Sequence, residues 1–124
     1  KAIKMIDTAV TEILNHVTDN VFEREVASTA LLPALCYVPI TDTPNDTLDA
    51  TGYRVARYQI SAVSIQSADA ATLAKQVRQH LKFVKGSFGG VNIALIKEQN
   101  TIPDFSGHPN VHRKMIDFNF YYGE

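Results

Sequence analysis

Apolar residues near the N-terminus recur at spacings of three and four, and polar residues such as Asp7 and Glu12 lie between them. The apolar positions are Ile3, Ile6, Val10, Ile13 and Val17. This period places the apolar side chains on one stripe of a helix, with the polar side chains on the opposite side. The pattern predicts an amphipathic helix over residues 2–17.

A second stripe with the same period covers residues 68–84. Its apolar positions are Ala70, Leu73, Ala74, Val77, Leu81 and Val84. Ser67 and Asp69 precede this stripe and are candidate N-caps, while Gly86 follows it as a stop signal. The sequence therefore predicts a second helix with a clear beginning and end.

Residues 54–66 alternate with a period of two, which places Tyr58, Ile60 and Ala62 on one face and Arg57, Gln59 and Ser61 on the other. We expect this segment to be the central strand. Two further strands are predicted near the C-terminus. In the first, Val91, Ile93 and Leu95 share a face; in the second, Ile116, Phe118, Phe120 and Tyr122 share a face, with Asp117, Asn119 and Tyr121 turned away.

Two segments before the central strand have strand-like composition but contain prolines. These short segments are residues 21–26 and 34–40, and Pro33 and Pro39 interrupt this region. Because proline cannot donate a hydrogen bond to a neighbouring strand, we expect only edge or short strands here. Residues 41–53 and 98–112 are polar and are predicted to be long loops, which in small domains are often binding arms.

The order of these elements predicts an α+β fold with one domain over residues 1–124. We expect a mostly antiparallel sheet with two helices packed on one face and long polar loops. A chain of 124 residues leaves no room for two independent cores, and 45% hydrophobic residues argue against general disorder.

The net charge of the chain is −1, so no overall basic field attracts it to nucleic acid or anionic lipid. The charges are unevenly distributed, however. Residues 1–53 contain 3 basic and 8 acidic side chains, whereas residues 54–124 contain 9 basic and 5 acidic ones. This polarity is compatible with attraction between neighbouring copies of the chain; the alternative is that the charges mix in space after folding.

The single cysteine, Cys36, lies in an apolar run, so it excludes an internal disulfide and is interpreted as a small buried residue. Asp7 and Glu12 interrupt the apolar positions at the N-terminus, which excludes the core of a signal peptide. No run approaches the roughly 20 apolar residues that span a bilayer. We therefore expect a protein of a reducing compartment with no membrane partner.

Few residues suggest chemistry. The glycines in residues 85–90 follow a helix and precede a strand, which is the reverse of a phosphate-binding loop, so a turn explains them. Asp104, His108 and His112 have the spacing of metal ligands on a helix, but Gly107 and Pro109 disfavour a helix there. Two exposed loop histidines are the alternative. His16 and His80 occupy polar helix positions and are predicted at the surface, and no catalytic signature is present.

A basic stripe follows the second helix opposite its apolar stripe. It consists of Lys75, Arg78, Lys82 and Lys85, at spacings of three, four and three. Such a stripe can follow a phosphate backbone, or it can be a solvated outer face. No aromatic residue lies among these cations to stack on bases.

Several segments, taken in order along the chain, form a pattern that resembles a known protein family. A polar stretch, Thr47-Leu-Asp-Ala-Thr-Gly-Tyr-Arg54, leads into an arginine-containing strand, Val55-Ala-Arg-Tyr-Gln-Ile-Ser61. A helix of the form Ala-x-x-Leu-Ala-x-x-Val-Arg follows in residues 70–78, and then a glycine-rich turn over residues 85–93. The final strand, Met115-Ile-Asp-Phe-Asn-Phe-Tyr-Tyr122, has the apolar-Asp-apolar pattern of the family and ends in aromatics. Together these segments resemble the tail completion, or tail terminator, proteins of long-tailed bacteriophages and prophages. The likeness covers the C-terminal two-thirds, while residues 21–40 and 98–112 depart from the family pattern.

The resemblance implies a structural virion protein without enzyme activity or cofactor. It implies a homo-oligomeric ring, typically of six subunits, which ends the tail tube at the head-tail junction and joins it to a head connector, adaptor or stopper protein. Genomic DNA would pass through the ring without sequence-specific binding, and assembly would take place in the cytoplasm of the bacterial host. A small α+β enzyme or ligand-binding domain with a metal site at Asp104, His108 and His112 is the alternative.

We expect the two polar arms and the strand beside the first of them to contact neighbouring subunits or virion proteins. The candidate contact residues are Asp42, Asn45, Asp46, Asp49, Tyr53, Arg54, Arg57, Asp104, Phe105, His108 and His112. The basic stripe of Lys75, Arg78, Lys82 and Lys85 is a candidate for facing the DNA channel.

Overall fold

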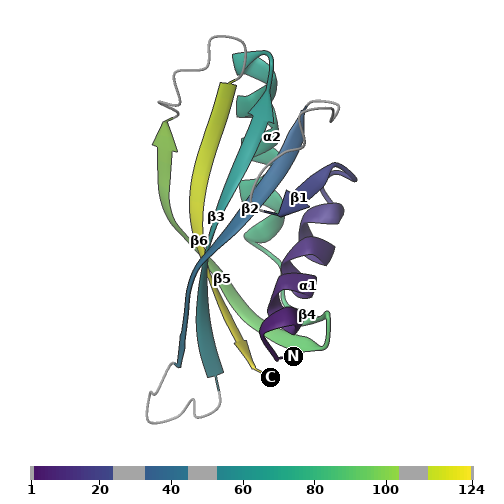
Figure 1. Ribbon diagram of the computed structural model, residues 1–124, viewed down its shortest axis with the longest axis vertical. Coiled ribbons are helices and arrows are strands. Elements are labelled where there is room, and N and C mark those ends of the chain that lie inside the picture. The colour runs from purple at the N-terminus through teal and green to yellow at the C-terminus, as the bar shows by residue number, and fades with distance from the viewer. Residues whose placement is uncertain (1, 24–32, 45–52, 104–111, 124) are drawn as a thin grey trace.

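The chain forms one six-stranded sheet with two helices on the same side of it (Figure 1). This computed structural model describes residues 2–23, 33–44, 53–103 and 112–123. The elements are α1 (Ala2–Asn15), β1 (Val21–Glu23), β2 (Ala34–Pro44), β3 (Tyr53–Ser64), α2 (Ser67–Leu81), β4 (Gly86–Phe88), β5 (Val91–Pro103) and β6 (His112–Gly123). Both predicted helices and the predicted strand over residues 54–66 are confirmed within a few residues at their ends.

The strand order is β1-β2-β3-β6-β5-β4. The pair β1 and β2 is parallel, and the other four neighbouring pairs are antiparallel. The sheet is therefore mixed and mostly antiparallel, which confirms the α+β expectation. The central position expected for β3 is also confirmed, because β3 pairs with β2 along one edge and with β6 along the other.

The core lies between the sheet and the two helices. Alternate residues of β3 and β6 point to the helices, among them Tyr58 and Ile60 from β3 and Phe118 and Phe120 from β6. From the predicted apolar stripes, the helices bury Ile6, Val10 and Ile13 of α1 and Ala70, Leu73, Ala74, Val77 and Leu81 of α2. Ala9 and Leu14 of α1, which the predicted stripe did not include, are buried with them. Burial of these faces in one continuous cluster is the main stabilising contribution to the fold.

The sheet is strongly twisted and curls into a half-barrel around α1 (Figure 1). The register shifts between Pro39 and Thr41 in β2, and at two places in β5. Each extra residue bends its strand and increases the local twist. Helix α1 closes the open side of the half-barrel, since it contacts both edge strands, β1 and β4. On the β4 side, Glu12 accepts a hydrogen bond from the Gly89 amide at 2.9 Å.

The prediction that Leu95 shares a face with Val91 and Ile93 is wrong. The register shift between Ile93 and Leu95 inserts Ala94 as an extra residue, so Leu95 pairs with Tyr121 on the face away from the helices. Leu95 is 46% exposed there, while Ile96 takes the buried position. A one-residue shift moves every following side chain to the opposite face, because the side-chain period of a strand is two.

The long loops predicted over residues 41–53 and 98–112 are wrong at both ends, where the structure has strands instead. Residues 41–44 belong to β2 and Tyr53 begins β3, while residues 98–103 belong to β5 and His112 begins β6. Polar residues form strands here because they pair with β3 and β6 while their side chains reach solvent. Pro39 and Pro44 fit in β2 because β1 covers only residues 35–37 of it, which leaves residues 38–44 at an edge within the described chain.

The predicted ends of the second helix also need correction. Gln66 occupies the N-cap position and makes no side-chain cap, so neither Ser67 nor Asp69 is the cap. The helix ends at Leu81, before Gly86, which belongs to β4. The glycines turn the chain instead at Gly89 and Gly90, whose φ angles of 56° and 86° allow the two-residue turn between Phe88 and Val91.

Candidate assembly surfaces

Asp42 and Arg54, two of the candidate contact residues, bind one another where β2, β3 and β6 run side by side. The register shift in β2 turns Asp42 to the helix face, where it lies beside the cross-strand pair of Arg54 and Tyr122. Arg54 Nε donates to Asp42 Oδ1 at 2.9 Å, and the Tyr122 hydroxyl donates to Asp42 Oδ2 at 2.7 Å. Both carboxylate oxygens are therefore occupied within the subunit.

This pairing changes the ionisation of its members. Hydrogen bonding to the Asp42 carboxylate, with its negative charge, raises the pKa of Arg54. Burial raises the pKa of Tyr122, and the hydrogen bond to Asp42 raises it further because a phenolate there would face an anion. Arg54 is thus a fixed cation and Tyr122 a fixed hydrogen-bond donor, and the cluster ties three strand ends together.

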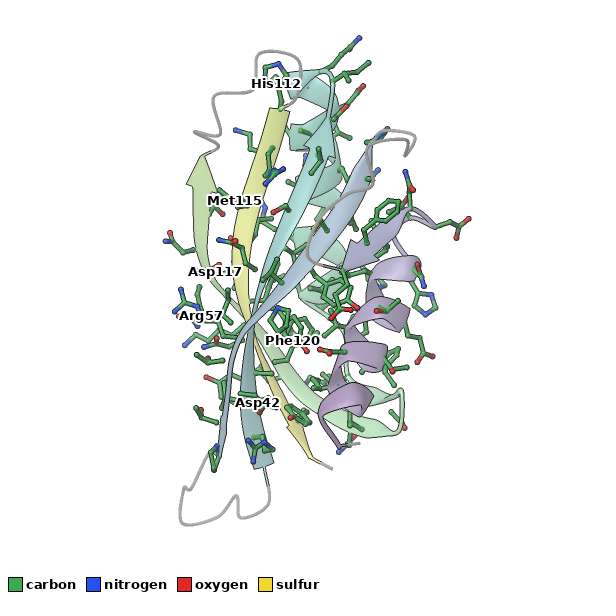
Figure 2. The ribbon with its side chains drawn as sticks, in the orientation of Figure 1. Asp42, Arg57, His112, Met115, Asp117 and Phe120 are labelled. Carbon is green, nitrogen blue, oxygen red and sulfur yellow. The ribbon has the colours of Figure 1, made fainter. Side chains whose placement is uncertain are left out.

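Arg57 forms an ion pair with Asp117 on the face of the sheet opposite the helices, as Figure 2 shows. Arg57 Nη2 lies 2.5 Å from Asp117 Oδ2. The Asp117 side chain is 3% exposed, whereas that of Arg57 is 47% exposed. Asp117 Oδ1 has no hydrogen-bond partner in the described part of the chain. The sequence predicted Arg57, but not Asp117, as a contact residue. The available signal was an acid between the apolar residues at positions 116 and 118.

An acidic groove, which sequence analysis missed, covers the exposed side of α1 and borders β1 and β2. It has a volume of about 850 Å³, and its lining includes Asp7, Glu12 and Glu23. The Tyr58 hydroxyl donates to Asp7 at its inner side, and Thr11 and Tyr37 share a hydrogen bond of 2.6 Å. Burial raises the pKa of both tyrosines, and the Asp7 carboxylate raises that of Tyr58 further.

A basic groove lies between α2 and β5. Its volume is about 500 Å³, its floor includes Ile96 and Phe118, and Arg78, Lys82 and Lys97 line it together with Glu98. The predicted basic stripe is therefore divided: Arg78 and Lys82 line the groove, whereas Lys75 and Lys85 are exposed outside its lining. Lys85 also follows the end of α2 at Leu81. Whether the stripe faces a channel stays a prediction.

The prediction that His16 and His80 lie at the surface is confirmed for His16, which is exposed, but not fully for His80. Their ring centroids lie 5.8 Å apart where α1 meets α2, and His80 is half-buried. The two histidines lie on helices that are far apart in the sequence, so no sequence pattern could predict their contact. Burial lowers the pKa of His80, and the positive charge that His16 can take lowers it further.

We expect this histidine pair to make stability depend on pH. The pKa of His80 is lower in the folded than in the unfolded state, so the unfolded chain takes up the proton first as pH falls below about 6.5. The contribution of neutral His80 to stability is complete above that pH and declines below it. Urea unfolding of wild type and His80→Gln between pH 7.5 and 5 measures this. An equal loss of stability in both proteins would contradict it.

The remaining predicted contact residues lie either at strand ends or outside the described part of the chain. His112 is exposed at the start of β6, and Tyr53 begins β3. Asn45, Asp46, Asp49, Asp104, Phe105 and His108 lie outside the described residues. Within the described ranges, no three His, Cys, Asp or Glu residues group as metal ligands, and no helix has the length and apolarity needed to cross a membrane. Cys36 is buried, as predicted.

In the ranges that the structure describes, two strands near the grooves have an open edge along part of their length: β2 over residues 38–44 and β5 over residues 94–103. Strand β4 pairs only with residues 91–93 of β5, so residues 94–103 have no second neighbouring strand among the described elements. Open edges present unpaired backbone N–H and C=O groups, which can bind another chain. Charged grooves beside open edges are suited to binding other proteins through shape and charge.

Comparisons with known proteins agree with the resemblance seen in the sequence. The family described as Tail completion protein gp17 matches residues 5–123. A chain of a solved structure titled "Virion of native gene transfer agent (GTA) particle" has the same fold, with a TM-score of 0.63 and 15% identity over 90% of this chain and 84% of that chain. A second solved chain matches with a TM-score of 0.53 and 15% identity over 98% and 95% of the two chains. A search of curated proteins gave no significant match.

The family match includes the segments that depart most from the expected pattern, residues 21–40 and 98–112, as well as both helices and the central strands. It covers nearly the whole chain, so the assignment does not depend on one motif. The chain belongs to the tail completion protein gp17 family.

Proposed function

We propose that this chain is a structural protein of a phage-type virion. In this proposal it forms a homo-oligomeric ring, of six subunits, that ends the tail tube at the head-tail junction. The observation that carries the proposal is the family match over residues 5–123. The shared fold with a chain from a gene transfer agent virion adds support, because that particle is itself a virion.

The described surfaces are compatible with this role. The subunit offers an open strand edge on β5, an acidic groove on α1 and a basic groove on α2, all of which can contact other proteins. Its partners in the proposal are further copies of itself, the tail tube protein and a head connector or stopper protein. Genomic DNA passes through the ring without sequence-specific binding, and the role needs neither catalysis nor a cofactor.

Removal of the gene tests this role. In the phage or prophage that encodes the chain, a deletion should leave DNA-filled heads and separate tails, because the two cannot join. Electron microscopy and the titre of infectious particles measure the effect, and a plasmid copy of the wild-type gene should restore both. Normal joined particles in the deletion strain, or purified virions that lack the protein, would contradict the proposal.

A further inference from the structure

We propose that copies of this chain associate head to tail, with the acidic groove of one copy against the basic groove of the next. The acidic groove is the one along α1, β1 and β2, and the basic groove is the one between α2 and β5. This inference rests on the proposed function and deepens it by naming the two surfaces through which subunits meet.

The acidic groove reaches the contact between α1 and α2, because His16 lines it, whereas the basic groove lies beyond that contact, between α2 and β5. The helices meet at His16 and His80, with Gln76 beside them. On α2, Arg78 and Lys82 project from the flank next to β5, away from that contact. On α1, Asp7 and Thr11 project toward β2 and β3, where they bind tyrosines. A neighbour can therefore occupy one groove without blocking the other.

The grooves have opposite charge. Asp7, Glu12 and Glu23 line the acidic groove, and its described lining contains one histidine, His16, and no lysine or arginine. Arg78, Lys82 and Lys97 line the basic groove, against the single carboxylate of Glu98. Neither groove complements itself, so two identical grooves would repel. Complementary potentials favour the contact between unlike grooves and select its orientation.

The basic groove has further features of an interface. It borders the open edge of β5, and Leu95, which also lines it, is 46% exposed. Its floor contains Ile96 and Phe118, so an occupant would bury apolar surface as well as pair charges. A contact between two different surfaces is heterologous: each pair of subunits keeps one free groove of each kind, so association continues until a ring closes.

Neutral substitutions at each groove test the contact. Arg78→Gln with Lys82→Gln disables the basic groove, and Glu12→Gln with Glu23→Gln disables the acidic one. We expect each variant alone to lose higher oligomers and to weaken association about tenfold or more, because each lacks one half of the contact. Native mass spectrometry and sedimentation velocity, at low and high salt, measure assembly. Lys75→Gln and Asp69→Asn on α2 are matched controls, since both residues are exposed outside the groove linings.

Mixing the two variants is the decisive measurement. One variant keeps its acidic groove and the other its basic groove, so an equimolar mixture should form one-to-one dimers that cannot grow. Groove variants that assemble like wild type, or a mixture without these dimers, would overturn the inference. So would a wild type that stays monomeric at every concentration tested. None of these results changes the outcome of the gene deletion, which tests the virion role separately.

Discussion

Replacement of Phe120 with alanine is expected to lower the free energy of unfolding by about 3–5 kcal/mol. Phe120 is fully buried on the helix side of β6 (Figure 2). Its ring packs edge to face against Tyr58 at 5.5 Å and against Phe118 at 6.5 Å. Alanine leaves a cavity that three neighbouring strands cannot fill, because paired strands cannot move together without breaking their register.

Phe83→Ala is the matched control. It removes the same atoms from a side chain that is 79% exposed, so its effect should stay within about 0.5 kcal/mol. Thermal and urea unfolding measure both variants, and the loss in Phe120→Ala should lower the melting temperature by roughly 10–20 °C. Equal stabilities of the two variants would contradict the placement of Phe120 at the centre of the core.

Replacement of Arg57 with methionine is expected to destabilise the fold by about 1–3 kcal/mol. The substitution keeps much of the side-chain volume but leaves the buried Asp117 carboxylate without its ion-pair partner. Loss of a partner from a fully buried pair costs more, but Arg57 is half-exposed, so solvent already weakens this interaction. Because methionine keeps much of the arginine volume, the main source of the loss is the Asp117 charge, which Arg57 then no longer compensates.

A double-mutant cycle with Asp117→Asn separates that charge from lost packing. The amide is neutral, so Arg57→Met should cost less in the Asp117→Asn background than in wild type. Urea unfolding of the four proteins at pH 7 gives the coupling energy. Additive losses would show that the two side chains do not stabilise the fold as a pair, and Arg57 would then be available for other contacts.

Much of the architecture follows from local patterns. The period of apolar residues located α1 and α2, and the alternation from Tyr58 to Ala62 located the central strand and its buried face. The difference in charge between the two halves of the chain was also apparent from the sequence. Part of it remains in space, since acids of the first half line the groove on α1 and bases of the second half line the groove on α2. Part of it mixes, as the alternative had it, because Asp42 of the first half pairs with Arg54 of the second. The family, too, was apparent from ordered segments of sequence.

The candidate surfaces depended on pairings between distant residues. Extra residues in β2 and β5 moved Asp42 to the helix face and Leu95 away from it, because register is set by the partner strand. The pair of Arg57 with Asp117 and the contact of His16 with His80 join residues 60 or more positions apart. The sequence by itself determined both helices, the central strand and the buried faces of these elements, since these depend on neighbours within a few residues. Only the tertiary structure decided which charges meet and which remain exposed, since that depends on how the sheet pairs and curls.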